Sequence, residues 1–237
     1  MKKICETHLL KFEYVCPKCL KPFLKHTNFS SLDEIREYQR INAKKVNLSD
    51  KIEQFKIAGI IKTKFIENIV YSILLFYDIN KERILNIRFK SYNSPYMKYF
   101  PSVLFLNHTD IYLNLIKDLP NYPDFYIVNS SGQIHPFFYG AACDFGLKTE
   151  IPVIGFTKNL LFGKIKDNEI EQGVKTIYHR SKLLGYAISK PYSKKFLYIS
   201  VGNNISLLTA LKIFLKIDFK IFSSLSIELN NYITKNR

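Results

Sequence analysis

Apolar and polar residues change their spacing along the chain in a way that distinguishes strands from helices. Between residues 55 and 92, three apolar runs are separated by short polar breaks, which predicts an antiparallel meander. Helical patterns then alternate with short buried strands. The expected elements are strands at 55–61, 68–79 and 83–92, a helix at 110–119, a strand at 124–128, a helix at 139–147, strands at 151–156, 186–189 and 196–202, and a helix at 205–217. This order predicts an α/β fold, with a mixed sheet flanked by helices.

A Ser-rich joint at residues 28–31 divides the chain into two units. It precedes an amphipathic helix at 32–46, for which Ser30 or Ser31 is the expected N-cap. We therefore expect residues 1–30 to form a small extension and residues 31–237 to form the main domain.

The longest apolar stretch, Ile69–Phe76, is too short to cross a bilayer and fits a buried strand. The first ten residues, MKKICETHLL, lack the long apolar run of a signal peptide. We therefore expect an intracellular protein, in the cytoplasm or nucleus, with no membrane partner.

The extension carries two closely spaced pairs of metal-ligating residues. Cys5 and His8 are separated by two residues, as are Cys16 and Cys19, and seven residues lie between the pairs. Three thiolates and one imidazole suit a closed, tetrahedral structural zinc site. The sequence therefore predicts a zinc knuckle, with His26 as an alternative ligand; the competing interpretation is a flexible arm with free thiols.

The net charge of the chain indicates which class of molecule it binds. The chain of 237 residues has 35 Lys and Arg against 20 Asp and Glu, a net charge of +15. The basic residues are scattered and do not form one tail, so a folded surface carries them. A globular protein this basic commonly binds a polyanion, and nucleic acid is the expected partner.

One candidate for a functional site is the end of the apolar strand Phe125 to Val128, where the chain enters a tight polar turn that opens with Asn129. Such strand ends are where α/β enzymes commonly place a metal-binding carboxylate. This segment, PDFYIVNSSGQIHP (123–136), and four others resemble motifs of endonuclease V, an RNase H-like nuclease that cleaves near inosine. The other four are KIAGII (56–61), KYFPSVLFLNH (98–108), YGAACDFGLKTEIPVIGFTKNLL (139–161) and ISVGNNISLLTAL (199–211).

The resemblance, which spans roughly residues 33 to 222, implies an RNase H-like sheet and a magnesium site made of carboxylates. The positions where the family carries its catalytic and metal-site residues hold other side chains here: Ile61, His108, Asn129 and Asn203. Asp144 stands where the family has a His, and Phe137 where it has an Arg. Ile61 offers no ligand atom, and a hard cation needs oxygen ligands. We therefore expect the magnesium site to be lost and the protein to be a pseudonuclease.

Residues of the substrate-facing scaffold are retained in the resemblance. The expected nucleic-acid-binding residues are Tyr99, Pro101, Gly132, His135 and Lys158. The favoured function is therefore binding of RNA or DNA without cleavage. Two alternatives remain open. One is a divergent metal-dependent endonuclease that acts on inosine-containing DNA or RNA and uses Asp144, His108 or other acids. The other is a scaffold subunit of a larger ribonucleoprotein or protein assembly.

Overall fold

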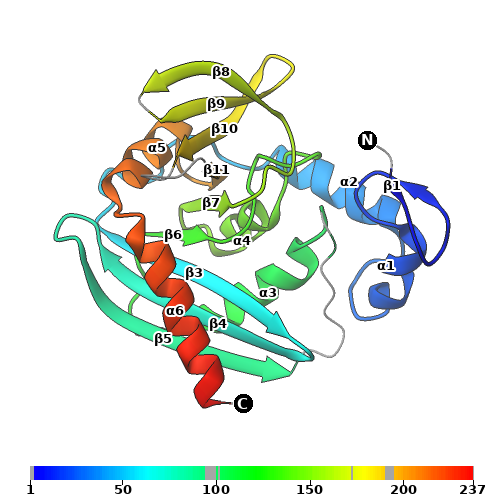
Figure 1. Cartoon of the computed structure of the whole chain (residues 1–237), viewed down its shortest axis with the longest axis horizontal. Coiled ribbons are helices and arrows are strands. Elements are labelled where there is room, and N and C mark those ends of the chain that lie inside the picture. Colours follow the sequence, from blue (N-terminus) through cyan, green and yellow to red (C-terminus); the bar gives the residue numbers. More distant parts are fainter. Residues whose placement is uncertain (1–2, 94–99, 101, 172, 190–194, 237) are drawn as a thin grey trace.

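A mixed sheet of nine strands forms the centre of the protein (Figure 1). The computed structural model describes residues 3–93, 100, 102–171, 173–189 and 195–236. The strands lie in the order β5-β4-β3-β6-β7-β11-β10-β9-β8. Within the described residues, no helix has the length and apolar character needed to cross a membrane.

The predicted meander is confirmed. β3 (Ile57–Ile66), β4 (Ile69–Asp78) and β5 (Arg83–Asn93) pair as antiparallel neighbours. Side chains of a strand alternate between the two faces of its sheet. Ile60 therefore enters the core on one face of the sheet, whereas Ile61 enters the core on the other face.

The centre of the sheet is parallel. β6 (Phe125–Val128) pairs in parallel with β3 on one side and with β7 (Val153–Thr157) on the other. β11 (Phe196–Asn203) is antiparallel to β7, and beyond it lie β10 (Lys182–Ser189), β9 (Val174–His179) and β8 (Lys164–Glu171). All four residues of β6 are buried, as expected for a strand covered on both faces.

Helices cover both faces of the sheet. α3 (Phe105–Ile116) and α4 (Ala141–Thr149) pack on the face that carries Ile61. α5 (Leu207–Lys216) and α6 (Lys220–Lys235) pack on the opposite face, with α6 running across the meander (Figure 1).

The N-terminal extension packs against one side of the main domain. It contains β1 (Lys3–Ile4), β2 (Lys11–Phe12) and α1 (Pro17–Leu24), and α2 (Leu32–Ala43) follows. The Ser31 hydroxyl accepts a hydrogen bond from the Glu34 amide, so Ser31 is the N-cap of α2. Phe23 of α1 lies 5.6 Å from Phe100, ring to ring, in an apolar cluster shared with the main domain.

Six elements were not predicted from the sequence: β1, β2, α1, β8, β9 and α6. The buried residues of α6 recur at helical spacing, at Ile221, Phe222, Leu225, Leu229 and Ile233. Ser and Asn residues between them have low helix propensity and obscure the pattern. Packing against β3 and β4 therefore contributes more to this helix than its local propensity does.

Candidate nucleic-acid interface and metal centre

Ile61 and Asn129 lie side by side on neighbouring parallel strands. Ile61 is in register with Val128, and the Asn129 amide donates a hydrogen bond to the Ile61 carbonyl over 3.2 Å. The Ile61 side chain is fully buried, whereas Asn129 is half-buried. Two of the sequence-predicted positions are thus adjacent, but only Asn129 offers a side-chain oxygen.

His108 of α3 lies on the same face of β3 as Ile61. Its ring centre is 5.3 Å from that of Phe65, which is four residues beyond Ile61 on β3, and 5.8 Å from that of Tyr112. Burial lowers the pKa of His108 to about 4, so the imidazole is neutral near pH 7. No described residue forms a hydrogen bond with its Nδ1 atom.

Asn203 lies away from this group. The sheet register pairs Asn203 with Val153, the first residue of β7, whereas Val128, just before Asn129, pairs with Gly155. Asn129 and Asn203 are therefore offset by roughly 10 Å along the strands. The Asn203 side chain accepts from the Asn47 amide and donates to the Gly146 carbonyl, both at 2.9 Å, so it links three segments of backbone. The structure does not bring it together with Ile61 and Asn129.

The residues around Asn129 do not fit a magnesium ion. Mg²⁺ needs several oxygen ligands, including carboxylates, in octahedral geometry. Ile61 provides no ligand atom and His108 provides nitrogen, which leaves the Asn129 amide as the oxygen of these three side chains. Across the described residues, three or more His, Cys, Asp or Glu side chains come within ligating distance of one another in one place, and that place is the N-terminal extension.

The carboxylate of Asp144 has partners inside the protein, with hydrogen bonds to one oxygen and an ion pair at the other. It is fully buried, and its Oδ1 accepts hydrogen bonds from the hydroxyls of Tyr38 at 2.7 Å and Tyr139 at 2.8 Å. Its Oδ2 lies 3.1 Å from Lys148 Nζ. Burial, followed by the charge of Asp144, raises the pKa of Tyr38, which remains a neutral hydrogen-bond donor. This arrangement is a structural anchor between α2 and α4.

His135 holds the backbone beside the predicted wedge. Its Nδ1 accepts from the Phe137 amide at 3.2 Å, so Nε2 carries the proton and donates to the Ser102 carbonyl at 2.9 Å. Burial lowers the pKa of His135 to about 3. Ser102 has a φ of 70°, in the region that favours glycine, and the Gln39 side chain also donates to its carbonyl at 2.9 Å. Both ring nitrogens of His135 are therefore engaged in hydrogen bonds inside the protein.

Two of the predicted binding residues, Tyr99 and Pro101, lie outside the described residues. Gly132 is inside them, and a Cβ atom there would lie 2.0 Å from the Val201 carbonyl oxygen. Its amide donates to the Ser200 hydroxyl at 3.0 Å. Gly132 thus allows the loop after β6 to cross closely over β11.

Lys158 is exposed directly after β7, at the same end of the parallel strands as Asn129. No ion-pair or hydrogen-bond partner of Lys158 Nζ occurs in the described part of the chain, so its ammonium group is free to contact a phosphate. Phosphate contacts of this kind add affinity without sequence preference.

Aromatic rings with cations over them occur on the loop that follows His135. The guanidinium carbons of Arg36 and Arg40, from α2, lie 6.0 and 5.3 Å from the centre of the half-buried Phe137 ring. On the next residue, Lys182 Nζ lies 4.3 Å from the Phe138 ring centre. Sequence reasoning missed these cations, although the i, i+4 spacing of Arg36 and Arg40 places them on one helix face.

The extension brings Cys5, His8, Cys16 and Cys19 together as predicted. Their ligand atoms all lie within 4.8 Å of one another. The Nδ1 atom of His8 is 3.5, 3.7 and 3.3 Å from the sulfurs of Cys5, Cys16 and Cys19. With metal–ligand bonds of about 2.0 to 2.3 Å, ideal tetrahedral angles separate ligand atoms by about 3.5 to 3.8 Å. The cluster therefore has the dimensions of a tetrahedral metal site, and His26 is not part of it.

The thiols of Cys5 and Cys19 differ in acidity. Burial raises the pKa of Cys5, but hydrogen bonds from the backbone and ring of His8 and from the other two thiols outweigh it and lower that pKa to about 6. A hydrogen bond with Cys5, followed by burial, raises the pKa of Cys19 to about 11. The Cys5 thiolate is therefore favoured over that of its neighbour Cys19.

A parallel core of β6 and β7 beside the β3–β5 meander, with helices on both faces, defines an RNase H-like α/β protein. The chain belongs to the endonuclease V family, whose model matches residues 40–221. It is 30% identical over 192 residues to endonuclease V of Dictyoglomus turgidum, covering 79% of this chain and 82% of the relative. It is 26% identical over 199 residues to endonuclease V of Dictyoglomus thermophilum, covering 83% and 86%.

Solved structures support the same fold. Endonuclease V of Ciona intestinalis, in complex with a 24mer DNA that contains an inosine followed by a ribo-adenosine, matches with a TM-score of 0.74. It is 18% identical, and the match covers 87% of this chain and 99% of that one. Human endonuclease V matches with a TM-score of 0.72 and 21% identity, covering 87% and 99%. The matched family region begins at residue 40, so the Cys/His cluster lies outside it.

Proposed function

We propose that this member of the endonuclease V family binds single-stranded RNA or DNA and does not cleave it by metal-dependent hydrolysis. One observation carries the proposal. Ile61 stands at a position where the family resemblance implies a metal-binding Asp, and its side chain is fully buried. It is in register with Val128, the residue before Asn129. A branched alkyl side chain at that point cannot be compensated by neighbours, because His108 is neutral and Asn129 is an amide.

The binding surface in this proposal combines charge with ring faces. Lys158 contacts a phosphate, while Phe137, whose ring lies near the guanidinium groups of Arg36 and Arg40, provides a platform on which a base can stack. Single-strand-binding proteins commonly combine basic surfaces with aromatic side chains in this way. The net charge of +15 supplies the long-range attraction.

The extension contributes a second contact in the same proposal. The Cys/His cluster holds a structural zinc ion, which fixes the short chain of residues 1–30 as a unit. Next to it, His8, Lys18, Lys21 and Lys25 line a cavity of about 410 Å³ with Pro22. The three lysines recur along one face of α1 and its end, so they present their ammonium groups together to a phosphate backbone.

Relatives indicate which strands to test. The Ciona protein was solved with inosine-containing DNA, so inosine-containing single strands of DNA and RNA are the appropriate ligands. Binding and cleavage are measured on the same samples with Mg²⁺ and with Mn²⁺. The proposal expects binding without metal-dependent products. Metal-dependent cleavage would instead assign the protein to the active enzymes of the family.

A further inference from the structure

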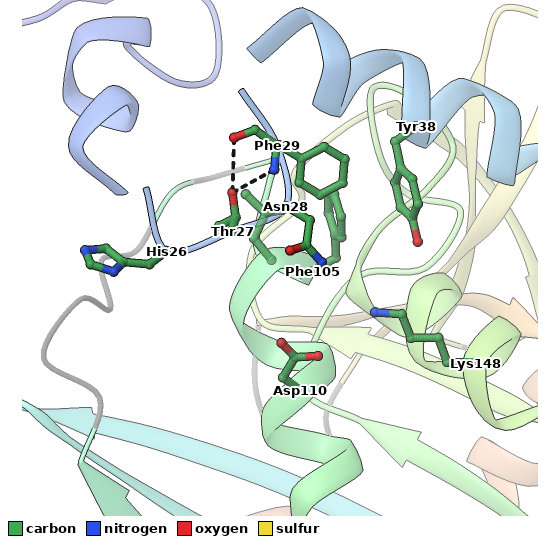
Figure 2. A pocket seen from close by; sticks show the side chains of 9 residues that line it. His26, Thr27, Asn28, Phe29, Tyr38, Phe105, Asp110 and Lys148 are labelled. Atoms are coloured by element: carbon green, nitrogen blue, oxygen red, sulfur yellow. Dashed lines mark hydrogen bonds between the residues drawn. The ribbon is translucent and has the colours of Figure 1, made fainter. Parts of the chain in front are cut away.

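A cavity of about 540 Å³ lies where the extension meets the main domain (Figure 2). Residues 26–29, which follow α1 and lead into α2, form one wall, and the other walls come from α2, α3 and α4. Because residues 26–29 precede the region matched by the family model, the cavity depends on a part of the chain outside that region.

Aromatic rings form the apolar part of the wall. Tyr38 and Phe105 stack with a centre-to-centre distance of 5.4 Å and an interplanar angle of 10°. Phe29 packs edge-on against Tyr38 at 5.3 Å and against Phe105 at 6.1 Å. Phe29 and Tyr38 are half-buried, so parts of their rings remain open to a planar ligand.

Polar groups of opposite kinds converge on the same space. In Figure 2, the side chains of Asn28, Asp110 and Lys148 point toward one another across the cavity. Asp110 is exposed, and no cation among the described residues forms an ion pair with it. The cavity therefore offers a pure acceptor, Asp110, facing a pure donor, Lys148.

The ammonium group of Lys148 is positioned by the buried carboxylate of Asp144. Lys148 Nζ lies 3.1 Å from Asp144 Oδ2, and the Tyr38 hydroxyl donates to Asp144 Oδ1 at 2.7 Å. One buried carboxylate thus positions both a cavity cation and a cavity ring before any ligand enters. Such preorganisation lowers the cost of ordering side chains on binding.

We propose that this cavity binds a guanine base. Guanine is planar, and its N1–H and N2–H groups lie next to each other, which matches the two oxygens of Asp110. Its O6 acceptor is beside N1, on the side that Lys148 occupies. Adenine and cytosine present one amino group to a carboxylate, and hypoxanthine lacks the N2 amine, so each offers fewer donors. The base comes from a free guanine nucleotide or from a bound strand.

This inference does not depend on the proposed strand binding. It invokes neither Lys158 nor Phe137, and a mononucleotide can test it alone. A protein that fails to bind strands can still bind guanosine monophosphate here, so failure of one proposal is distinguishable from failure of the other.

The experiment is calorimetric titration of the full chain, loaded with zinc, with guanosine, inosine, adenosine and cytidine monophosphates. A parallel titration uses short single strands that contain one guanine or none. The expected result is a preference for guanine over the other bases, with affinity falling about 10- to 100-fold in Asp110→Asn, which loses a charge-assisted acceptor. Asp110 is exposed, so this variant is expected to fold.

Glu82→Gln is the matched control, because Glu82 is an exposed acid in the turn between β4 and β5, at the far end of the sheet. Lys148→Met is expected to weaken guanine binding as well, and Lys148→Arg to retain part of it. Asp110-dependent binding of the mononucleotide identifies a free nucleotide as a ligand, and the same dependence in strands alone identifies a strand base. If guanine shows no advantage, or Asp110→Asn binds it as well as Glu82→Gln does, the proposal is overturned.

Discussion

The Asn129 amide donates a hydrogen bond to the carbonyl oxygen of Ile61, 3.2 Å away across neighbouring parallel strands. This contact belongs to the backbone and is independent of both side chains. The strand ends therefore keep their arrangement while the side chains that would hold a metal ion can change. Binding without cleavage is compatible with an intact fold for this reason.

Zinc content tests the extension. Elemental analysis of the purified protein is expected to find about one zinc ion per chain. Cys16→Ser and Cys19→Ser should each lose it, whereas Cys143→Ala, which changes a buried cysteine outside the cluster, should retain it. Circular dichroism should show that the sheet of the Cys19→Ser variant remains folded. Zinc in this variant at the level of the unaltered protein would contradict the assignment of ligands.

Acid should destabilise the protein through two buried histidines. Folding lowers the pKa of His108 to about 4 and that of His135 to about 3, mainly by burial. The unfolded chain therefore binds protons first, and stability present above about pH 6.5 is lost as the pH falls toward these values. Each histidine contributes a slope of up to about 1.4 kcal/mol per pH unit in that window.

His108→Leu tests this account. Nδ1 of His108 has no described hydrogen-bond partner, so removing the ring should change the free energy of unfolding little at pH 7. The same variant should be less sensitive to acid than the unaltered protein in urea titrations between pH 7 and pH 4. An unchanged pH slope would show that His108 is not protonated on unfolding as described.

Salt dependence tests the role of Lys158. If its ammonium group contacts one phosphate, Lys158→Ala should reduce the slope of log affinity against log salt by about 0.7 to 0.9. The loss should be similar for strands of different sequence, because a phosphate contact carries no base information. Lys81→Ala, in the distant turn after β4, is the control and should leave the slope nearly unchanged.

Stacking of a base on Phe137 should affect affinity and not its salt dependence, in contrast to the phosphate contact of Lys158. Phe137→Ala should weaken binding of single strands by about 1 to 3 kcal/mol, with little change in salt slope. Arg36 and Arg40 remain in this variant, so the loss reports the ring and not the charge. Phe196→Ala, at the start of β11, gives a comparison at another partly buried ring. Equal effects of the two substitutions would argue against a platform at Phe137.

Much of the sheet could be predicted because its strands are long and strongly apolar. The β3–β5 meander and the β6 strand follow from runs such as residues 68–79, whose period and length leave little ambiguity. The Cys/His cluster could also be predicted, because each ligand pair is separated by two residues and the two pairs are close together in the sequence.

Other features depend on contacts between distant residues. Motif order suggested that Asn203 belongs with Asn129, but the register of β11 against β7 separates them. Asp144 was an open candidate for a metal ligand until its contacts with Tyr38 and Tyr139 were known. Long-range pairings of this kind leave no local pattern in the sequence, which is also why the cavity at Asp110 was not anticipated.

The most direct test of binding without cleavage is one assay on one sample. The zinc-loaded protein is incubated with labelled single strands that contain one inosine, with Mg²⁺ or Mn²⁺, and bound and cut strands are quantified together. The account predicts salt-sensitive binding and no metal-dependent product, both for the unaltered protein and for Asn129→Asp, because Ile61 still leaves the cation short of ligands. Metal-dependent cutting by the unaltered protein that is abolished by Asn129→Ala would contradict it.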